Sequence, residues 1–173
     1  EAKVLITDRE FSAAIERALA QVAHRPLVID VDDPAWTGGR RLGECDYEAF
    51  LAQGDPGYRW SRPEDEWDAI SLNYTSGTTG NPKGVLYSHR STVLHAYGSS
   101  LPDGLGASAR DCILPVVPMF HVTAWGLPYA CALTGAKLVM PGPHLDGASL
   151  YTMFEEEGVT MSAGVPTIWL GLL

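Results

Sequence analysis

The sequence predicts an α/β protein, with layers of helices on both sides of a mostly parallel sheet. The first reason is an alternation of strand-like and helix-like segments, which begins with a strand at residues 3–7, a helix, and a second strand at residues 26–31. The second reason is composition. A chain of 173 residues with 46% hydrophobic and 19% charged side chains is typical of a globular domain that has a core of its own.

The first helix is expected to follow Asp8, whose carboxylate can accept a hydrogen bond from the first helical turn. Four apolar residues recur behind it at near-helical spacing, namely Phe11, Ile15, Leu19 and Val22. Residues 32–68 are rich in glycine, proline and charged groups, so we expect them to cross the surface, with one short helix near residues 47–52.

The middle of the chain reads as two strands, residues 69–74 and 84–87, joined by a loop of threonine, serine and glycine. Ser88 can cap the helix that follows. The apolar residues of this helix are expected to face one way, and they are Val93, Leu94, Tyr97 and Leu101.

The C-terminal part continues the alternation. Strands are expected at residues 112–117, 137–140 and 160–163, and helices near residues 124–133 and from Asp146 to Gly158. Asp146 can cap its helix, although three glutamates, residues 155–157, lie unfavourably near the negative end of the helix dipole. Pro166 suits the first turn of a last helix.

The charge distribution excludes one class of partner. The net charge is −9, and residues 1–73 hold 15 of the 21 acidic side chains. A negative overall field argues against nucleic acid as a partner. Between residues 69 and 145 the only acidic residues are Asp103 and Asp111, which leaves room for a small anion there.

The cysteines and the hydropathy pattern indicate the compartment. Cys45, Cys112 and Cys131 are an odd number with wide spacing, so free thiols and a reducing, cytoplasmic setting are expected. No apolar run reaches the ~18 residues that span a bilayer, and no signal-peptide pattern opens the sequence.

The segment that carries chemistry is residues 74–84, Tyr-Thr-Ser-Gly-Thr-Thr-Gly-Asn-Pro-Lys-Gly. It combines hydroxyl donors with glycines that let several backbone N–H groups converge on one anion. The hydroxyls belong to Thr75, Ser76, Thr78 and Thr79, and the glycines are Gly77, Gly80 and Gly84. Lys83 adds a positive charge suited to phosphate oxygens. A Walker A loop is excluded because a proline precedes this lysine and a strand follows it. The alternative is a turn that binds nothing.

A second candidate segment is Phe-His-Val-Thr-Ala-Trp, residues 120–125. It follows a predicted strand at its carboxyl end, which is where α/β folds bind ligands. From the residues alone, the alternative stays open that His121 and Trp125 are core residues without a functional role. The other four histidines have no metal-ligand spacing.

These segments resemble the adenylate-forming enzymes, the AMP-dependent synthetases and ligases that include acyl-CoA synthetases, luciferases and the adenylation domains of peptide synthetases. The resemblance rests on residues 74–84 and continues through residues 85–90, 114–121 and 163–167. It is strong from Ser71 onward and general before that, and it is closest to the medium- and long-chain fatty acid CoA ligases.

The resemblance implies a reaction in two steps. ATP and a carboxylic acid give an acyl-adenylate and pyrophosphate, and the thiol of CoA then displaces AMP. The implied phosphate-binding residues are Thr75, Ser76, Gly77, Thr78, Thr79, Gly80 and Lys83. Of these, Lys83 would be catalytic and Thr75 would also contact Mg²⁺. His121 would lie near the reacting carboxylate as a second catalytic residue, and Trp125, Gly164 and Val165 would line the acyl pocket with it. A homodimer is possible.

The resemblance further implies a fragment. Residues 1–173 would be a piece of the single large N-terminal, ATP- and acyl-binding domain of an acyl-CoA synthetase, without the C-terminal lid domain, and inactive alone. Two alternatives stay open: another adenylate-forming enzyme, such as an aryl- or amino-acid-activating or luciferase-like one, and a non-catalytic nucleotide-binding module.

Overall fold

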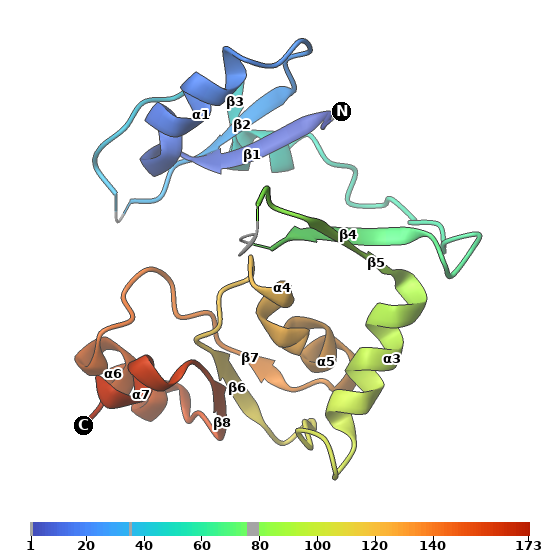
Figure 1. Cartoon of the computed structure of the whole chain (residues 1–173), viewed down its shortest axis with the longest axis vertical. Coiled ribbons are helices and arrows are strands. Elements are labelled where there is room, and N and C mark those ends of the chain that lie inside the picture. Colours follow the sequence, from blue (N-terminus) through green and yellow to red (C-terminus); the bar gives the residue numbers. More distant parts are fainter. Residues whose placement is uncertain (1, 35, 76–79) are drawn as a thin grey trace. The chain divides into compact units, whose positions relative to one another are not determined.

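The computed structural model describes residues 2–34, 36–75 and 80–173 (Figure 1). The chain forms two compact units, residues 1–61 and residues 62–173, and each is described by itself. Every helix in the described ranges is too short or too polar to cross a membrane. That both units belong to one larger N-terminal domain stays a prediction.

The N-terminal unit is built on a three-stranded parallel sheet with the order β1-β2-β3. The strands are β1 (Val4–Asp8), β2 (Leu27–Val31) and β3 (Cys45–Asp46), and β1 pairs with β2 along its whole length. The helical elements are η1 (Arg9–Phe11), α1 (Ser12–Leu19) and α2 (Tyr47–Leu51). Asp8 caps as predicted, since its carboxylate accepts a hydrogen bond from the backbone of Glu10 at 2.8 Å.

The first helix ends earlier than the apolar spacing predicts. It stops at Leu19, so Val22 lies outside it and is half exposed. The chain must return within a few residues to start β2 parallel to β1. Pro26, just before β2, also disfavours helical geometry in the residue that precedes it.

A buried carboxylate holds the loop that leads to β3. The side chain of Asp30 is only 1% exposed and accepts hydrogen bonds from the backbone N–H groups of Leu42 and Gly43. These bonds satisfy a polar group that the strand places inside the unit.

The C-terminal unit begins with an antiparallel hairpin of β4 (Ala69–Tyr74) and β5 (Gly84–Ser88). Ser88 then caps α3 (His89–Ser100), as the sequence predicts, in a reciprocal arrangement with Ser91. The apolar residues of α3 do face one way, but that face is exposed. The helix packs on α5 (Leu127–Thr134) through its small side chains, with Ala96 and Ser99 buried.

The second sheet of this unit is parallel, with the order β7-β6-β8. Its strands are β6 (Cys112–Pro115), β7 (Lys137–Leu138) and β8 (Met161–Ala163), and its other helices are α4 (Val122–Trp125), α6 (Gly147–Glu157) and α7 (Pro166–Leu170). Asp146 caps α6 through the backbone of Ser149, and α6 ends at Gly158, as predicted.

Neighbouring residues of β6 point into two separate clusters, because side chains alternate across a strand. Ile113 packs with Leu127 and Cys131 on the side of α5. Leu114 packs with Leu150 of α6, and helix α7 covers the same face. The central strand is therefore covered by helices on both sides (Figure 1), and the predicted α/β class with mostly parallel sheets is confirmed.

Candidate functional site

The loop between β4 and β5 is closed at its base by the two residues that follow and precede the strands. The backbone N–H of Thr75 donates to the carbonyl of Lys83 at 2.9 Å. The N–H of Lys83 donates to the hydroxyl of Thr75 at 3.4 Å. Because Tyr74 is paired with Gly84, these bonds extend the hairpin by one pair. Both residues are exposed.

Four of the predicted phosphate-binding residues, Ser76, Gly77, Thr78 and Thr79, lie outside the described residues. Gly80, at the end of that segment, has a φ of 150°, which L side chains rarely adopt. The hairpin therefore brings Thr75, Gly80 and Lys83 into one loop.

A hydrogen bond joins this hairpin to the second candidate segment. The side-chain amide of Asn73 donates to the hydroxyl of Thr123 at 3.1 Å. The sequence analysis assigned no role to either residue. One sequence feature could have pointed to Asn73. It alternates with apolar residues along a predicted strand, so its polar side chain lies on the opposite face from theirs.

The turn after His121 is left-handed. Val122, Thr123, Ala124 and Trp125 have φ values of 51°, 51°, 50° and 56°. Such angles cost roughly 1–2 kcal/mol per residue for L-amino acids, most of all for β-branched ones. The turn is held by full burial of Ala124 and by bonds from the Gly126 N–H to the carbonyls of Val122 and Thr123. Strained backbone of this kind clusters at functional sites.

A hollow of about 200 Å³ lies beside the hairpin. Strands β4 and β5 contribute Ser71 and Tyr87, helix α3 contributes one wall, and Val122 and Thr123 of the left-handed turn contribute another. The opening combines apolar surface with hydroxyl groups, which is the composition of a small-molecule site.

A second hollow, of about 330 Å³, lies farther along α3 and is lined by Trp125 and Leu105. Of the predicted pocket residues, Trp125 thus lines this second hollow. His121 is exposed at the start of the turn, directly before Val122 and Thr123. Gly164 and Val165 line neither hollow: the carbonyl of Gly164 accepts a hydrogen bond from the indole of Trp169 at 3.1 Å, and Val165 precedes α7.

The cysteines and the acidic residues supply no metal centre in the described ranges. These ranges contain no group of three or more His, Cys, Asp or Glu side chains that could hold an ion. The three cysteines are free, as predicted. Burial raises the pKa of the Cys131 thiol, so this residue is a packing group with little thiolate character.

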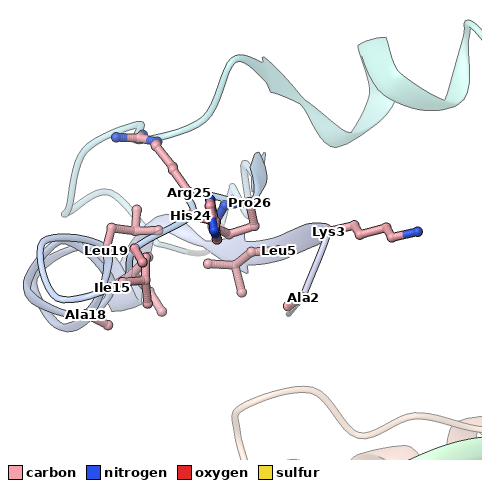
Figure 2. Close-up of a pocket in the computed structure, with 11 residues that line it drawn as sticks. Ala2, Lys3, Leu5, Ile15, Ala18, Leu19, His24, Arg25 and Pro26 are labelled. Atoms are coloured by element: carbon pink, nitrogen blue, oxygen red, sulfur yellow. The ribbon is translucent and has the colours of Figure 1, made fainter.

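The N-terminal unit has a hollow of its own, of about 810 Å³, between α1 and β1. Figure 2 shows Ile15, Ala18 and Leu19 of α1 beside Leu5 of β1, while the charged end of Lys3 extends away from them. The surface is mostly apolar, although Lys3, His24 and Arg25 also line it, and none of the predicted site residues lies there.

The whole chain matches a known protein family. The sequence profile described as "AMP-binding enzyme" matches residues 1–173. The chain is 52% identical to the medium-chain-fatty-acid–CoA ligase of Ectopseudomonas oleovorans, covering 100% of this chain and 32% of that protein. It is 51% identical to the 3-methylmercaptopropionyl-CoA ligase of Ruegeria pomeroyi, with the same two coverages.

The fold has solved counterparts as well. A crystal structure of a long-chain-fatty-acid-CoA ligase from Archaeoglobus fulgidus matches with a TM-score of 0.77 at 24% identity, covering 97% of this chain and 31% of that one. At this identity the match concerns the fold alone. The chain spans about a third of the length of the curated relatives it matches.

Proposed function

We propose a function from one premise: the chain belongs to the AMP-binding enzyme family. In this proposal it is part of a longer enzyme that activates a carboxylic acid with ATP. An acyl-adenylate and pyrophosphate form first, and CoA then takes the acyl group to give acyl-CoA and AMP. Fatty acids are the favoured substrate class, because a medium-chain-fatty-acid–CoA ligase is 52% identical over the whole chain.

The observation that carries the proposal is the closed base of the loop between β4 and β5. Its two residues, Thr75 and Lys83, are joined by hydrogen bonds, and both are exposed. In the proposal, an anion bound at this loop would accept hydrogen bonds from the hydroxyl of Thr75 and be attracted by the charge of Lys83. Polyphosphate is the anion that this donor set suits best.

The chemistry of the first step fits such a loop. Negative charge builds on the bridging oxygen as pyrophosphate leaves, and fixed donors that are aimed at this charge lower the barrier. In the proposal, Lys83 and the loop residues from Thr75 to Gly80 bind the β- and γ-phosphates and then hold the leaving pyrophosphate.

A Mg²⁺ ion that accompanies ATP fits the donor set only in part. Mg²⁺ is usually held by substrate phosphates and by one or two protein groups. The hydroxyl of Thr75 can be one of these, because its oxygen keeps a lone pair beyond the hydrogen bond from Lys83. When bound, the ion would neutralise phosphate charge.

The acyl group has a place beside this loop in the same proposal. The hollow of about 200 Å³ is lined by both strands that flank the phosphate loop and by the turn after His121. A carboxylate bound near His121 would therefore lie between the ATP phosphates and this opening. A reducing compartment such as the cytoplasm suits the three free thiols.

A second candidate substrate is 3-methylmercaptopropionate, because a ligase named for it is 51% identical to the chain. Both candidates use the same reaction, so the substrate alone separates them. The hollow beside the hairpin accommodates a thioether as readily as a hydrocarbon.

The test is ATP–pyrophosphate exchange and acyl-CoA formation by the longer protein. The panel contains straight-chain fatty acids of increasing length, 3-methylmercaptopropionate, an aryl acid and several amino acids. We expect the highest kcat/KM with a fatty acid. A preference for the thioether acid would select the second candidate, an aryl or amino acid would indicate another adenylate-forming activity, and no exchange with any acid would overturn the proposal.

A further inference from the structure

His95, on helix α3, lies at the boundary between the two hollows of the C-terminal unit. Among the described residues, it is the one lining residue that the two hollows share. The first hollow, beside the hairpin, measures about 200 Å³. The second, at Leu105 and Trp125, measures about 330 Å³. His95 is an exposed residue that borders both hollows.

The imidazole lies directly against the backbone of Gly126, which has no side chain to keep it away. A Cβ atom on Gly126 would lie 2.7 Å from Nδ1 and 2.9 Å from Cε1 of His95. These distances are shorter than van der Waals contact, so the ring packs directly against the backbone between α4 and α5. Gly126 also has a φ of 70°, which favours glycine at this position.

Ser99, on the same helix as His95, contacts both its ring and its backbone. The hydroxyl of Ser99, one turn further along α3, lies 3.5 Å from Nδ1 of His95. It also donates a hydrogen bond to the His95 carbonyl at 3.0 Å. Ser99 is buried against α5, so the backbone that carries the ring is fixed on the packed face of the helix.

We propose that His95 is the specificity-determining residue that ends the acyl-binding pocket and so limits the length of the substrate. This inference rests on the proposed function, in which the acid lies in the hollow beside the hairpin. Its carboxylate would be near the phosphate loop, and its tail would run along α3 toward His95. Beyond the ring, the second hollow offers space that the tail cannot reach.

The first experiment replaces the ring in the longer protein. His95→Ala is expected to join the two hollows, so acids longer than the wild-type optimum should gain buried surface. Each additional buried methylene is expected to raise kcat/KM by about fourfold relative to wild type, until the second hollow is filled. The measurement is ATP–pyrophosphate exchange across straight-chain acids, reported as the ratio of kcat/KM between long and short acids.

Two further variants test whether the volume of the ring, and not another property of His95, causes the change in chain-length preference. His95→Phe keeps a ring of similar size and is expected to keep the wild-type optimum. Leu94→Ala is the matched control, because Leu94 is the neighbouring residue on α3, is 57% exposed and lines neither hollow. It should leave the length profile unchanged. If His95→Ala does not fold, His95→Thr tests a smaller loss of volume, with a correspondingly smaller shift expected.

The outcomes distinguish this inference from the function on which it rests. A protein that activates no carboxylic acid overturns the proposed function. A protein that activates acids, but whose truncated variants keep the wild-type length profile, overturns only the role of His95. A shift to longer acids in His95→Phe as large as that in His95→Ala would also overturn it, since ring volume would then not be the cause.

Discussion

At the scale of single residues, the pairing of Thr75 with Lys83 shows how the register of two strands brings two polar side chains together. The hairpin pairs Tyr74 with Gly84, so the next residues outward must face each other. A lysine at this place has its ammonium group on a long flexible stem beside a loop of hydroxyls and glycines. In the proposed function, the register would therefore let Lys83 contact the same anion as Thr75.

The first prediction concerns this lysine. Lys83→Ala in the longer protein is expected to reduce adenylate formation by ~10²-fold or more, the size typical of one group that stabilises transition-state charge. Pyrophosphate exchange measures the effect. Lys137→Ala is the control, because Lys137 is an exposed lysine of the same unit that pairs with Glu157 instead. Undiminished pyrophosphate release in Lys83→Ala would remove this residue from the role.

At the scale of elements, hydrogen bonds from side chains fix where strands and helices begin. Asp111, just before β6, accepts bonds from the backbone and the hydroxyl of Ser108 and from the hydroxyl of Thr160, just before β8. The same Thr160 oxygen accepts from the backbone of Cys112. One carboxylate thus aligns the starts of two neighbouring parallel strands.

The second prediction is a dependence on pH. Bonds from Ser108 and then Thr160 hold the pKa of Asp111 below its ordinary value. A lowered folded-state pKa means that the stabilisation is present above the unfolded-state pKa and is lost as the pH falls through the folded-state pKa. Asp111→Asn should therefore lower the melting temperature at neutral pH, and its difference from wild type should shrink in acid.

Thermal unfolding followed by circular dichroism, at neutral and acidic pH, measures this effect. Asp103→Asn is the matched control, because Asp103 is an exposed aspartate of the same unit for which the structure gives no hydrogen bond. A loss of stability in Asp111→Asn that stayed constant down to strongly acidic pH would contradict the electrostatic explanation.

The end of α6 shows how tertiary contacts compensate an unfavourable local sequence. Three glutamates occupy the last turn, where the helix dipole is negative. Lys137 of β7 forms a salt bridge with the last of them, Glu157, and also donates a hydrogen bond to its carbonyl at 3.1 Å. The sequence alone gave no account of this glutamate, because its partner is 20 residues away.

At the scale of the whole molecule, many large apolar side chains are exposed. Tyr58 and Trp60 are 73% and 71% exposed, and Leu86 of the hairpin is 66% exposed. Contact with further protein would remove such side chains from water, which is favourable for apolar surface. The chain also spans about a third of the length of its curated relatives, so both observations are in line with the proposal that it acts within a longer enzyme.

The third prediction follows from this proposal. The purified 173-residue chain is expected to form no acyl-CoA and to bind ATP weakly at most, because a complete site would need contacts to adenine and ribose from other parts of the enzyme. Acyl-CoA formation and equilibrium binding of ATP measure this, with the longer protein as the positive control. Turnover by the 173-residue chain would show that it holds the whole catalytic machinery.

The sequence by itself determined the α/β class, most elements, the caps at Asp8, Ser88 and Asp146, and the resemblance to the family that the whole chain matches. Caps and turns depend on residues a few positions apart, so a local pattern is enough to predict them. The tertiary structure alone decided that α1 ends at Leu19 and that the small side chains of α3 form its packed face. It also decided that His95 meets Gly126, because that contact depends on how closely two helices approach, which no local pattern records.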